Sequence, residues 1–294
     1  MLLVLFIRSP MRFRLLFLVF GSVLLTTSLL AQSPLEFRTL SQDVIEVRLQ
    51  AFSVKNDQRE ATLKQLFVQS GCKDDRLSEQ VVRKNLPPNL ICVLPGATDQ
   101  VILVGAHSDH VDKGDGVVDN WSGASLLPSL FYSMSATPRR HTYVFVAFTE
   151  EEAGLIGSEF YARNLPADQR TQVSGMVNLD TLGLGPTEVW TSRSDNSMLD
   201  ALAQTAFAVK IPVTAMNVDQ VGSTDSESFA HYKIPRITIH SVTPETWPIL
   251  HSTRDKLNVV KIKDYYESYH LIAAYLAFLD TYLDQPAPPP KSLQ

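Results

Sequence analysis

Apolar and polar positions along the chain predict helices and strands in alternation. Apolar residues at mostly helical spacing over residues 37–66 predict one or two helices that end near Gly71. Beyond them, short apolar runs predict strands over residues 90–94, 101–104, 142–148, 173–179 and 236–240. Helical patterns cover residues 122–134, 157–164, 196–209 and 263–283. The first two strands, joined by a short turn, are expected to be neighbours. Fully apolar strands between helices are typical of a largely parallel sheet covered on both faces.

The two ends of the chain depart from this pattern. Arg8, Arg12 and Arg14 precede an apolar run over residues 15–30, which ends at Ala31. This order predicts an export signal over residues 1–31, cleaved after Ala31, although the run is also nearly long enough for a membrane anchor. The proline-rich residues 285–294 predict a disordered tail. We therefore expect one domain over residues 32–284, exported to the periplasm or secreted, with membrane contact only through the signal or anchor.

Charge and cysteine content narrow the possible partners and compartments. The net charge is −5, and no cluster of Lys and Arg follows the first fifteen residues, so a nucleic-acid partner is not expected. Cys72 and Cys92 are the only two cysteines, and their spacing excludes a CxxC motif. In an oxidising compartment such a pair predicts a disulfide, with two buried thiols as the alternative.

Side chains of the types that bind metals follow the predicted strands. They are His107, Asp109, Asp119, the run Glu150-Glu151-Glu152, Asp180 and His251. Taken singly, each has an ordinary interpretation: Asp119 could cap a helix, and three glutamates could form a solvated turn. Taken together they favour a site, because ligands of open α/β sheets bind where strands end and loops begin.

Five ordered blocks resemble the di-zinc aminopeptidase family, which includes secreted bacterial leucyl aminopeptidases and is related to glutaminyl cyclases and plasma-type glutamate carboxypeptidases. The blocks are His107-Ser108-Asp109, VDNWSG at residues 118–123, FTEEEAGLIGS at residues 148–158, Asn178-Leu179-Asp180 and HSTRD at residues 251–255. The resemblance covers residues 90–279. It implies a three-layer sandwich in which a mixed, mostly parallel sheet of about eight strands lies between helices, with metals at the carboxyl ends of central strands.

The same resemblance implies a zinc ligand set. Asp119 corresponds to the carboxylate that bridges two zinc ions. His107 and Asp180 complete one site, and Glu152 and His251 complete the other. These donor types suit zinc, which binds imidazole nitrogen and carboxylate oxygen and leaves a position open for water in catalytic sites.

Two further carboxylates correspond to catalytic positions of the family. Asp109 resembles the residue that orients the imidazole of His107. Glu151 resembles the general base that takes a proton from the metal-bridging water and passes it to the leaving amine. The family places the ligand two residues before the pair Gly154-Leu155, which selects Glu152 as the ligand, Glu151 as the base and Glu150 as an extra, solvated or locally bonded residue.

Other ionisable residues are expected outside the metal set. His110, Asp112 and Asp115 should line the rim, while His141, His231, His240 and His270 should be structural. Asp225 and Phe229 match a further family block, but Ser226 stands where a histidine often follows the aspartate, so the resemblance assigns this segment no role. Trp247, Ile249 and Leu250 could line an apolar pocket or simply pack the loop before His251.

The function that the resemblance implies is the removal of amino-terminal residues from peptides with a free amino terminus. Two alternatives stay open. One is a glutaminyl cyclase, which shares the fold and typically uses one zinc ion, and the other is a peptidase-like domain that only binds. A serine hydrolase and a single-zinc peptidase are disfavoured, because the chain contains neither G-x-S-x-G nor H-E-x-x-H.

Overall fold

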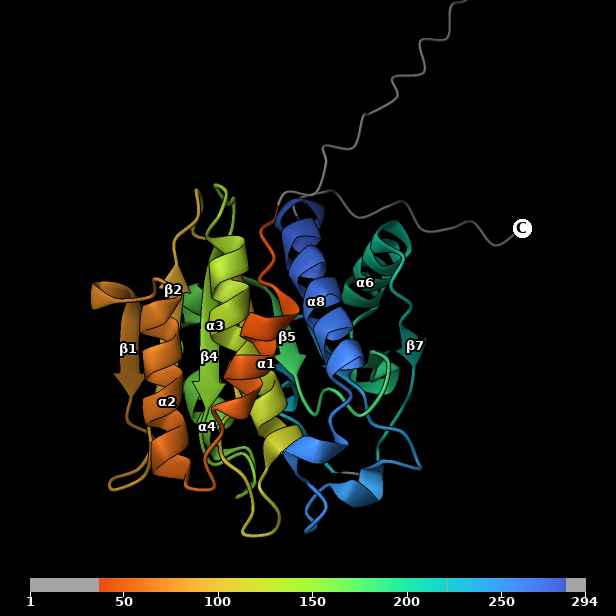
Figure 1. Ribbon diagram of the computed structural model, residues 1–294. Helices are drawn as coiled ribbons and strands as arrows, with labels where there is room; N and C mark the ends of the chain where they lie inside the picture. Colours follow the sequence, from red (N-terminus) through yellow and green to blue (C-terminus); the bar gives the residue numbers. More distant parts are fainter. Residues whose placement is uncertain (1–36, 221, 284–294) are drawn as a thin grey trace, which may run out of the picture. The chain divides into compact units, whose positions relative to one another are not determined.

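The computed structural model describes residues 37–220 and 222–283, whose strands form one sheet (Figure 1). The sheet has the order β1-β2-β4-β3-β5-β8-β6-β7. Its strands are β1 (Leu77–Gln80), β2 (Asn89–Leu94), β3 (Val101–His107), β4 (Thr142–Phe148), β5 (Val173–Leu179), β6 (Glu188–Val189), β7 (Thr214–Ala215) and β8 (Arg236–His240). The four central strands, β4, β3, β5 and β8, run parallel. Antiparallel β2 and β6 flank them, so the expected mixed sheet is confirmed.

Helices cover both faces of the sheet. They are α1 (Gln42–Gln50), α2 (Asn56–Gln69), α3 (Ser122–Met134), α4 (Ile156–Asn164), α5 (Ala167–Gln172), α6 (Asn196–Val209), α7 (Glu227–Ala230) and α8 (Ile262–Tyr282). Helices α1, α2, α3, α6 and α8 pack in the larger core cluster, on the face turned to the viewer in Figure 1. Residues of α4 and α7 pack on the other face. The three-layer arrangement is therefore also confirmed.

The alternation of side chains along the central strands divides the core into these two layers. In β4, Tyr143 and Phe145 point into the larger cluster, while Val144, Val146 and Phe148 point into the smaller one. Successive residues of a strand face opposite sides of the sheet, so a strand buried on both faces must be apolar throughout. This explains why β4 is apolar at every position after Thr142.

The expected pairing of the first two strands is wrong. Strand β4 lies between β2 and β3 and pairs with both, antiparallel to β2 and parallel to β3. Strand β4 is apolar, so it is most stable inside the sheet with a strand paired along each edge. The chain after β2 therefore passes the position of β4, and β3 pairs with the other edge of β4. Strands β1, β6 and β7 and helix α5 were not expected, because they are short and carry no continuous apolar run.

The expected disulfide is confirmed between Cys72 and Cys92, whose Cα atoms lie 6.3 Å apart. Cys72 follows α2 and Cys92 belongs to β2, and both are fully buried in the larger core cluster. The bond therefore attaches the amino-terminal helices to the sheet.

The proposed signal over residues 1–31 and the proline-rich residues 285–294 lie outside the described residues. Among the helices within residues 37–220 and 222–283, none is long and apolar enough to cross a membrane.

Candidate metal centre

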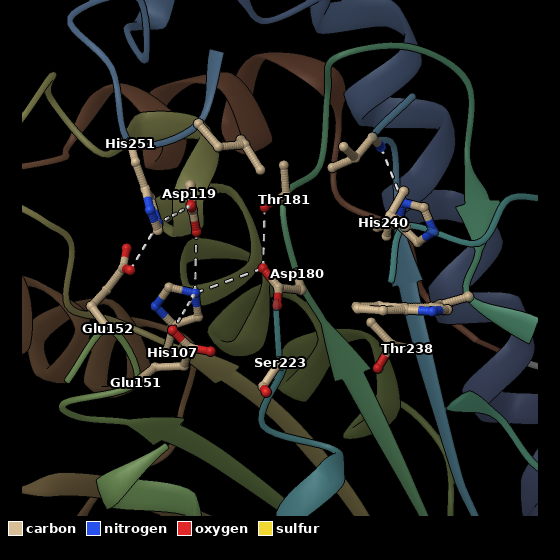
Figure 2. Close-up of a pocket in the computed structure, with 14 residues that line it drawn as sticks. His107, Asp119, Glu151, Glu152, Asp180, Thr181, Ser223, Thr238, His240 and His251 are labelled. Atoms are coloured by element: carbon tan, nitrogen blue, oxygen red, sulfur yellow. Dashed lines mark hydrogen bonds and ion pairs between the residues drawn. The ribbon is translucent and has the colours of Figure 1, made fainter. Parts of the chain in front are cut away.

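The site residues gather at the carboxyl ends of the central parallel strands (Figure 2). His107 is the last residue of β3, Glu151 and Glu152 follow β4, and Asp180 follows β5. Asp119 lies in the helical turn Val117–Trp121 before α3, and His251 lies in the loop after the turn Trp247–Ile249. Parallel strands end at one edge of a sheet, so residues up to 144 positions apart in sequence converge there.

Asp119 occupies the middle of this group. Its Oδ1 lies 3.3 Å from Nε2 of His107, and its Oδ2 lies 3.2 Å from Nε2 of His251. The two oxygens of one carboxylate thus face two different imidazoles. A carboxylate placed in this way could be shared by two metal ions.

Each imidazole also faces a second carboxylate. Nε2 of His107 lies 3.7 Å from Oδ1 of Asp180, and Nε2 of His251 lies 2.8 Å from Oε2 of Glu152. The donor atoms of His107, Asp119 and Asp180 all lie within 4.8 Å of one another, and so do those of Asp119, Glu152 and His251. These two groups are the same two that the resemblance to the family implies, and they meet at Asp119.

The electrostatics of the centre fit a bound cation. Burial, Asp225 and Asp180 raise the pKa of Glu151 to about 10, although His107 opposes them. The carboxylates Asp119 and Glu152 raise the pKa of His251 to about 10 through their hydrogen bonds. Oε1 of Glu152 is buried with no hydrogen-bond partner among the described residues. The centre thus contains two imidazoles and several crowded carboxylates, one of which has an oxygen without a hydrogen-bond partner in the described part of the chain. These donor types could bind a divalent zinc ion.

Asp109 has two structural roles. Its carboxylate accepts the backbone N–H groups of Glu151 at 3.1 Å and Glu152 at 3.2 Å, which fixes the glutamate loop against β3. Nδ1 of His107 lies 3.2 Å from the carbonyl oxygen of Asp109 and 3.7 Å from its carboxylate. The sequence suggested only the contact with the imidazole, because a hydrogen bond to a distant backbone leaves no pattern in the chain.

Asn120 joins the segments that carry Asp119 and Asp180. Its Nδ2 donates to the carbonyl oxygen of Leu179 at 2.8 Å, and its Oδ1 accepts the backbone N–H of Thr181 at 3.1 Å. The side chain of Asn120 therefore binds the backbone on both sides of Asp180. Because Asn120 directly follows Asp119, these bonds hold the two candidate ligands close together.

The segment with Asp225 supports Asp180 from the other side. Oγ1 of Thr224 donates to Oδ2 of Asp180 at 2.6 Å, and Asn178 donates to the same hydroxyl. Asp225 itself is fully buried, and burial raises its pKa to about 7. Ser226 pairs with Thr238 at 2.8 Å. The sequence block without an assigned role thus contains a residue that positions a candidate ligand.

The pocket beside the centre has a cavity volume of about 60 Å³ and opens to solvent. The candidate ligands and Glu151 gather on one side, and His240 and Thr238 lie on the other (Figure 2). We refer to the first set as the acidic wall: His107, Asp119, Glu151, Glu152, Asp180 and His251. We refer to the apolar lining residues as the apolar wall: Trp190, Val218, Val242 and Leu250.

Trp190 is the largest residue of the apolar wall and is held on three sides. Its Nε1 donates to Ser192 at 3.0 Å and to Asp219 at 3.2 Å, and the guanidinium of Arg193 lies 5.6 Å from its ring centre. The ring of His240 packs edge-on against the ring of Trp190, with 6.4 Å between the ring centres. Of the three residues considered as pocket lining from the sequence, only Leu250 lines the pocket. Trp190 follows the two-residue strand β6, which no apolar run revealed.

His240 was expected to be structural but also lines the pocket. Its Nδ1 accepts the backbone N–H of Val242, so its Nε2 donates to the carbonyl oxygen of Met216 at 3.0 Å. Burial lowers its pKa to about 4, so the ring is neutral at physiological pH. Glu150, His110, Asp112 and Asp115 do not line the pocket.

The chain is similar to known proteins at the level of the family, of the sequence and of the structure. Residues 89–276 match the model of peptidase family M28. Leupeptin-inactivating enzyme 1 of Streptomyces exfoliatus is 30% identical over 151 residues, which are 50% of this chain and 34% of that protein. The chain thus spans about a third of the length of this curated relative.

Solved structures show the same fold. BSAP, a zinc aminopeptidase from Bacillus subtilis, is 23% identical with a TM-score of 0.60, over 66% of this chain and 50% of that one. A glutaminyl cyclase from Porphyromonas gingivalis is 16% identical with a TM-score of 0.64, over 83% of this chain and 99% of that one. The family match extends over well more than half of the chain and includes most of the strands that carry the site. The chain belongs to peptidase family M28.

Proposed function

We propose that this protein is a zinc-dependent aminopeptidase that binds two zinc ions and hydrolyses the amino-terminal residue from peptides. The observation that carries the proposal is the position of Asp119, whose two carboxylate oxygens face His107 and His251 at 3.3 and 3.2 Å. A single-ion site needs no such shared carboxylate. The match to peptidase family M28 and the name of the Bacillus zinc aminopeptidase support a peptidase.

The two donor groups would hold the ions. His107, Asp180 and Asp119 form the first group, and Asp119, Glu152 and His251 form the second. Zinc bound there would act as a Lewis acid toward the scissile carbonyl and lower the pKa of water.

Glu151 is the general base of this proposal. Its side chain is 11% exposed and reaches the centre, with Oε2 4.0 Å from Nε2 of His107. It also forms a donor group with His107 and Glu152, but neither of the two groups that share Asp119 includes it. Glu151 accepts a proton from the water that attacks the scissile carbonyl and donates it to the departing amine. Burial and Asp225 raise its pKa most, and Asp180 and Asp119 raise it further; cations bound to Asp180 and Asp119 would lower it and favour the ionised form.

The two walls give the substrate a defined orientation. The free amino group of a peptide has a basic nitrogen that the zinc-loaded acidic wall could bind, while the nitrogen of an N-acetylated peptide is not basic. The first side chain would contact Trp190 and Val242 of the apolar wall. We therefore propose that peptides with an apolar amino-terminal residue are the preferred substrates.

Metal analysis of the purified protein, combined with a substrate panel, tests this function. We expect about two zinc ions per chain and loss of activity on chelation. Peptides with a free apolar amino terminus should be cleaved, and their N-acetylated forms should not. Equal cleavage of free and acetylated peptides would exclude an aminopeptidase.

Glutaminyl cyclase activity is the second candidate, because the Porphyromonas enzyme is covered over 99% of its chain whereas the Bacillus aminopeptidase is covered over 50%. Amino-terminal Gln peptides in the same panel separate the two activities. Cyclisation of Gln, with one zinc ion and no peptide cleavage, would favour the cyclase. Zinc binding without either reaction would indicate a binding domain.

We further propose that residues 1–31 are an export signal or anchor and that residues 32–284 are the catalytic domain. The buried Cys72–Cys92 disulfide supports an oxidising compartment. Mass analysis of the protein recovered from periplasm or medium tests this proposal. We expect a mature chain that begins after Ala31, and a full-length chain in the membrane fraction would instead indicate an anchor.

A further inference from the structure

The guanidinium of Arg59 lies directly behind the candidate metal centre. Arg59 belongs to α2, outside residues 89–276 that match the family, and it is fully buried. All three of its nitrogens donate to backbone carbonyl oxygens. Nε donates to Ser53 at 2.6 Å, Nη1 to Ser108 at 3.1 Å, and Nη2 to both Asp115 and Gly116 at 2.7 Å.

Three of these carbonyls belong to loops that carry candidate ligands. Ser108 directly follows His107, and Gly116 precedes Asp119 by three residues. The guanidinium is planar and rigid, so its two terminal nitrogens fix the separation of the two loops that they bind. The distance between His107 and Asp119 is therefore set partly by a side chain from a helix that contributes no ligand.

Asp255 holds the same segment through the segment's backbone N–H groups. Its carboxylate accepts the backbone N–H groups of Val118 at 2.7 Å and Asp119 at 3.1 Å, and its carbonyl oxygen accepts that of Asp115 at 2.7 Å. Asp255 is 2% exposed and follows His251 by four residues. Arg59 and Asp255 together connect the loops of His107, Asp119 and His251.

The positive charge of Arg59 is favoured by the carboxylates around it. It is buried near several carboxylates, namely Asp109, Asp119, Glu152 and Asp255, which attract its positive charge. Its guanidinium also lies 5.7 Å from the ring centre of Trp121. A fixed cation at this position reduces the repulsion among carboxylates that must lie close together before any metal binds.

We propose that Arg59 is a positioning residue that holds the His107 and Asp119 loops at ligand spacing in the metal-free protein. This inference rests on the proposed function, in which these residues bind zinc. It assigns to α2 a role in preparing the centre for metal.

The first test uses the unaltered full chain. Backbone hydrogen exchange is measured in peptides that cover residues 107–119, in the zinc-loaded and the metal-stripped protein. We expect this segment to exchange less than about tenfold faster after zinc removal, because Arg59 and Asp255 already fix it. Exchange at the rate of an unfolded segment in the metal-free protein would overturn the proposal.

The second test compares Arg59→Lys with the matched control Arg48→Lys. Arg48 is a second buried arginine, on α1, whose Nη1 donates to Ser129 at 2.8 Å and to no ligand loop. Lysine keeps the charge at either position but cannot reach all the carbonyls that arginine binds. Zinc affinity is measured by chelator competition, together with hydrogen exchange of residues 107–119 in both metal-free variants.

Arg59→Lys should weaken zinc affinity by about 10- to 100-fold, the usual effect of losing a residue that orients a ligand. It should also accelerate exchange in residues 107–119, whereas Arg48→Lys should change neither by more than about twofold. Equal behaviour of the two variants in both measurements would overturn the proposal. If the unaltered chain bound no zinc, the proposed function would fail, while the exchange comparison would still decide whether Arg59 positions the loops.

Discussion

The acidic wall and the apolar wall of the pocket are assembled in different ways. The residues of the acidic wall stand at or just after strand ends, or in turns held by buried polar side chains such as Asn120 and Asp255. Two residues of the apolar wall come from near short elements, Trp190 after the two-residue strand β6 and Val218 in the loop that follows β7. The other two lie closer to the acidic wall in the chain, because Val242 follows the central strand β8 and Leu250 directly precedes His251. Most of the acidic wall thus stands at the ends of central strands, while Trp190 and Val218 of the apolar wall depend on short elements and loops for their position.

The two walls should also respond differently to substitution. Changes in the acidic wall are expected to alter turnover or metal content, and changes in the apolar wall are expected to alter the choice of substrate. The following predictions test this division, in order of decreasing effect.

Glu151→Gln should give the largest loss. The amide keeps the size of the side chain but cannot accept a proton, so turnover should fall by roughly 10²- to 10⁴-fold. Because Glu151 is not needed as a ligand, zinc content should stay near that of the unaltered protein. Steady-state kinetics and metal analysis of the same preparation measure both quantities. Full activity of this variant would refute the proposed mechanism.

Glu152→Gln should act on metal content instead. The substitution removes the carboxylate whose Oε2 lies 2.8 Å from His251, so the second donor group loses one of its three members. Zinc should fall from about two ions per chain toward one, and activity should fall with it. Elemental analysis after extensive dialysis checks this. If the metal content were unchanged while turnover collapsed, the roles assigned to Glu151 and Glu152 would have to be exchanged.

Trp190→Ala should change selectivity without changing metal content. Loss of the largest residue of the apolar wall should lower kcat/KM for peptides with a large apolar first residue by about 10- to 100-fold. Peptides that begin with Ala should be affected much less, because their side chain has little contact to lose. Trp247→Ala is the matched control, since Trp247 is 37% exposed and does not line the pocket. An equal loss with all substrates would place Trp190 in the catalytic step instead.

Glu150→Gln should have the smallest effect. The residue adjoins Glu151 in sequence but does not line the pocket, so only a screened charge is removed. Turnover and zinc content should each change by less than about twofold. If this variant were inactive but fully loaded with zinc, the alignment of the glutamate run to Gly154 would be shifted by one residue.

The amino-acid sequence by itself predicted most of the architecture. Apolar runs gave the bounds of β4, β5 and β8 and of α3 and α6 to the residue, because buried strands and helices carry strong local patterns. It also predicted the disulfide and, through the resemblance to the family, the residues that meet around Asp119. Short motifs at strand ends are local in sequence, so they can be recognised before the fold is known.

Tertiary structure decided which distant groups meet. It placed β4 between β2 and β3, directed the carboxylate of Asp109 to the glutamate loop, and brought Trp190 to the pocket. It also brought Arg59, from an ordinary polar position in α2, behind two ligand loops. Such contacts depend on packing between elements far apart in the chain. A single buried arginine or tryptophan has no periodic pattern of its own, and therefore only the folded chain reveals what it holds in place.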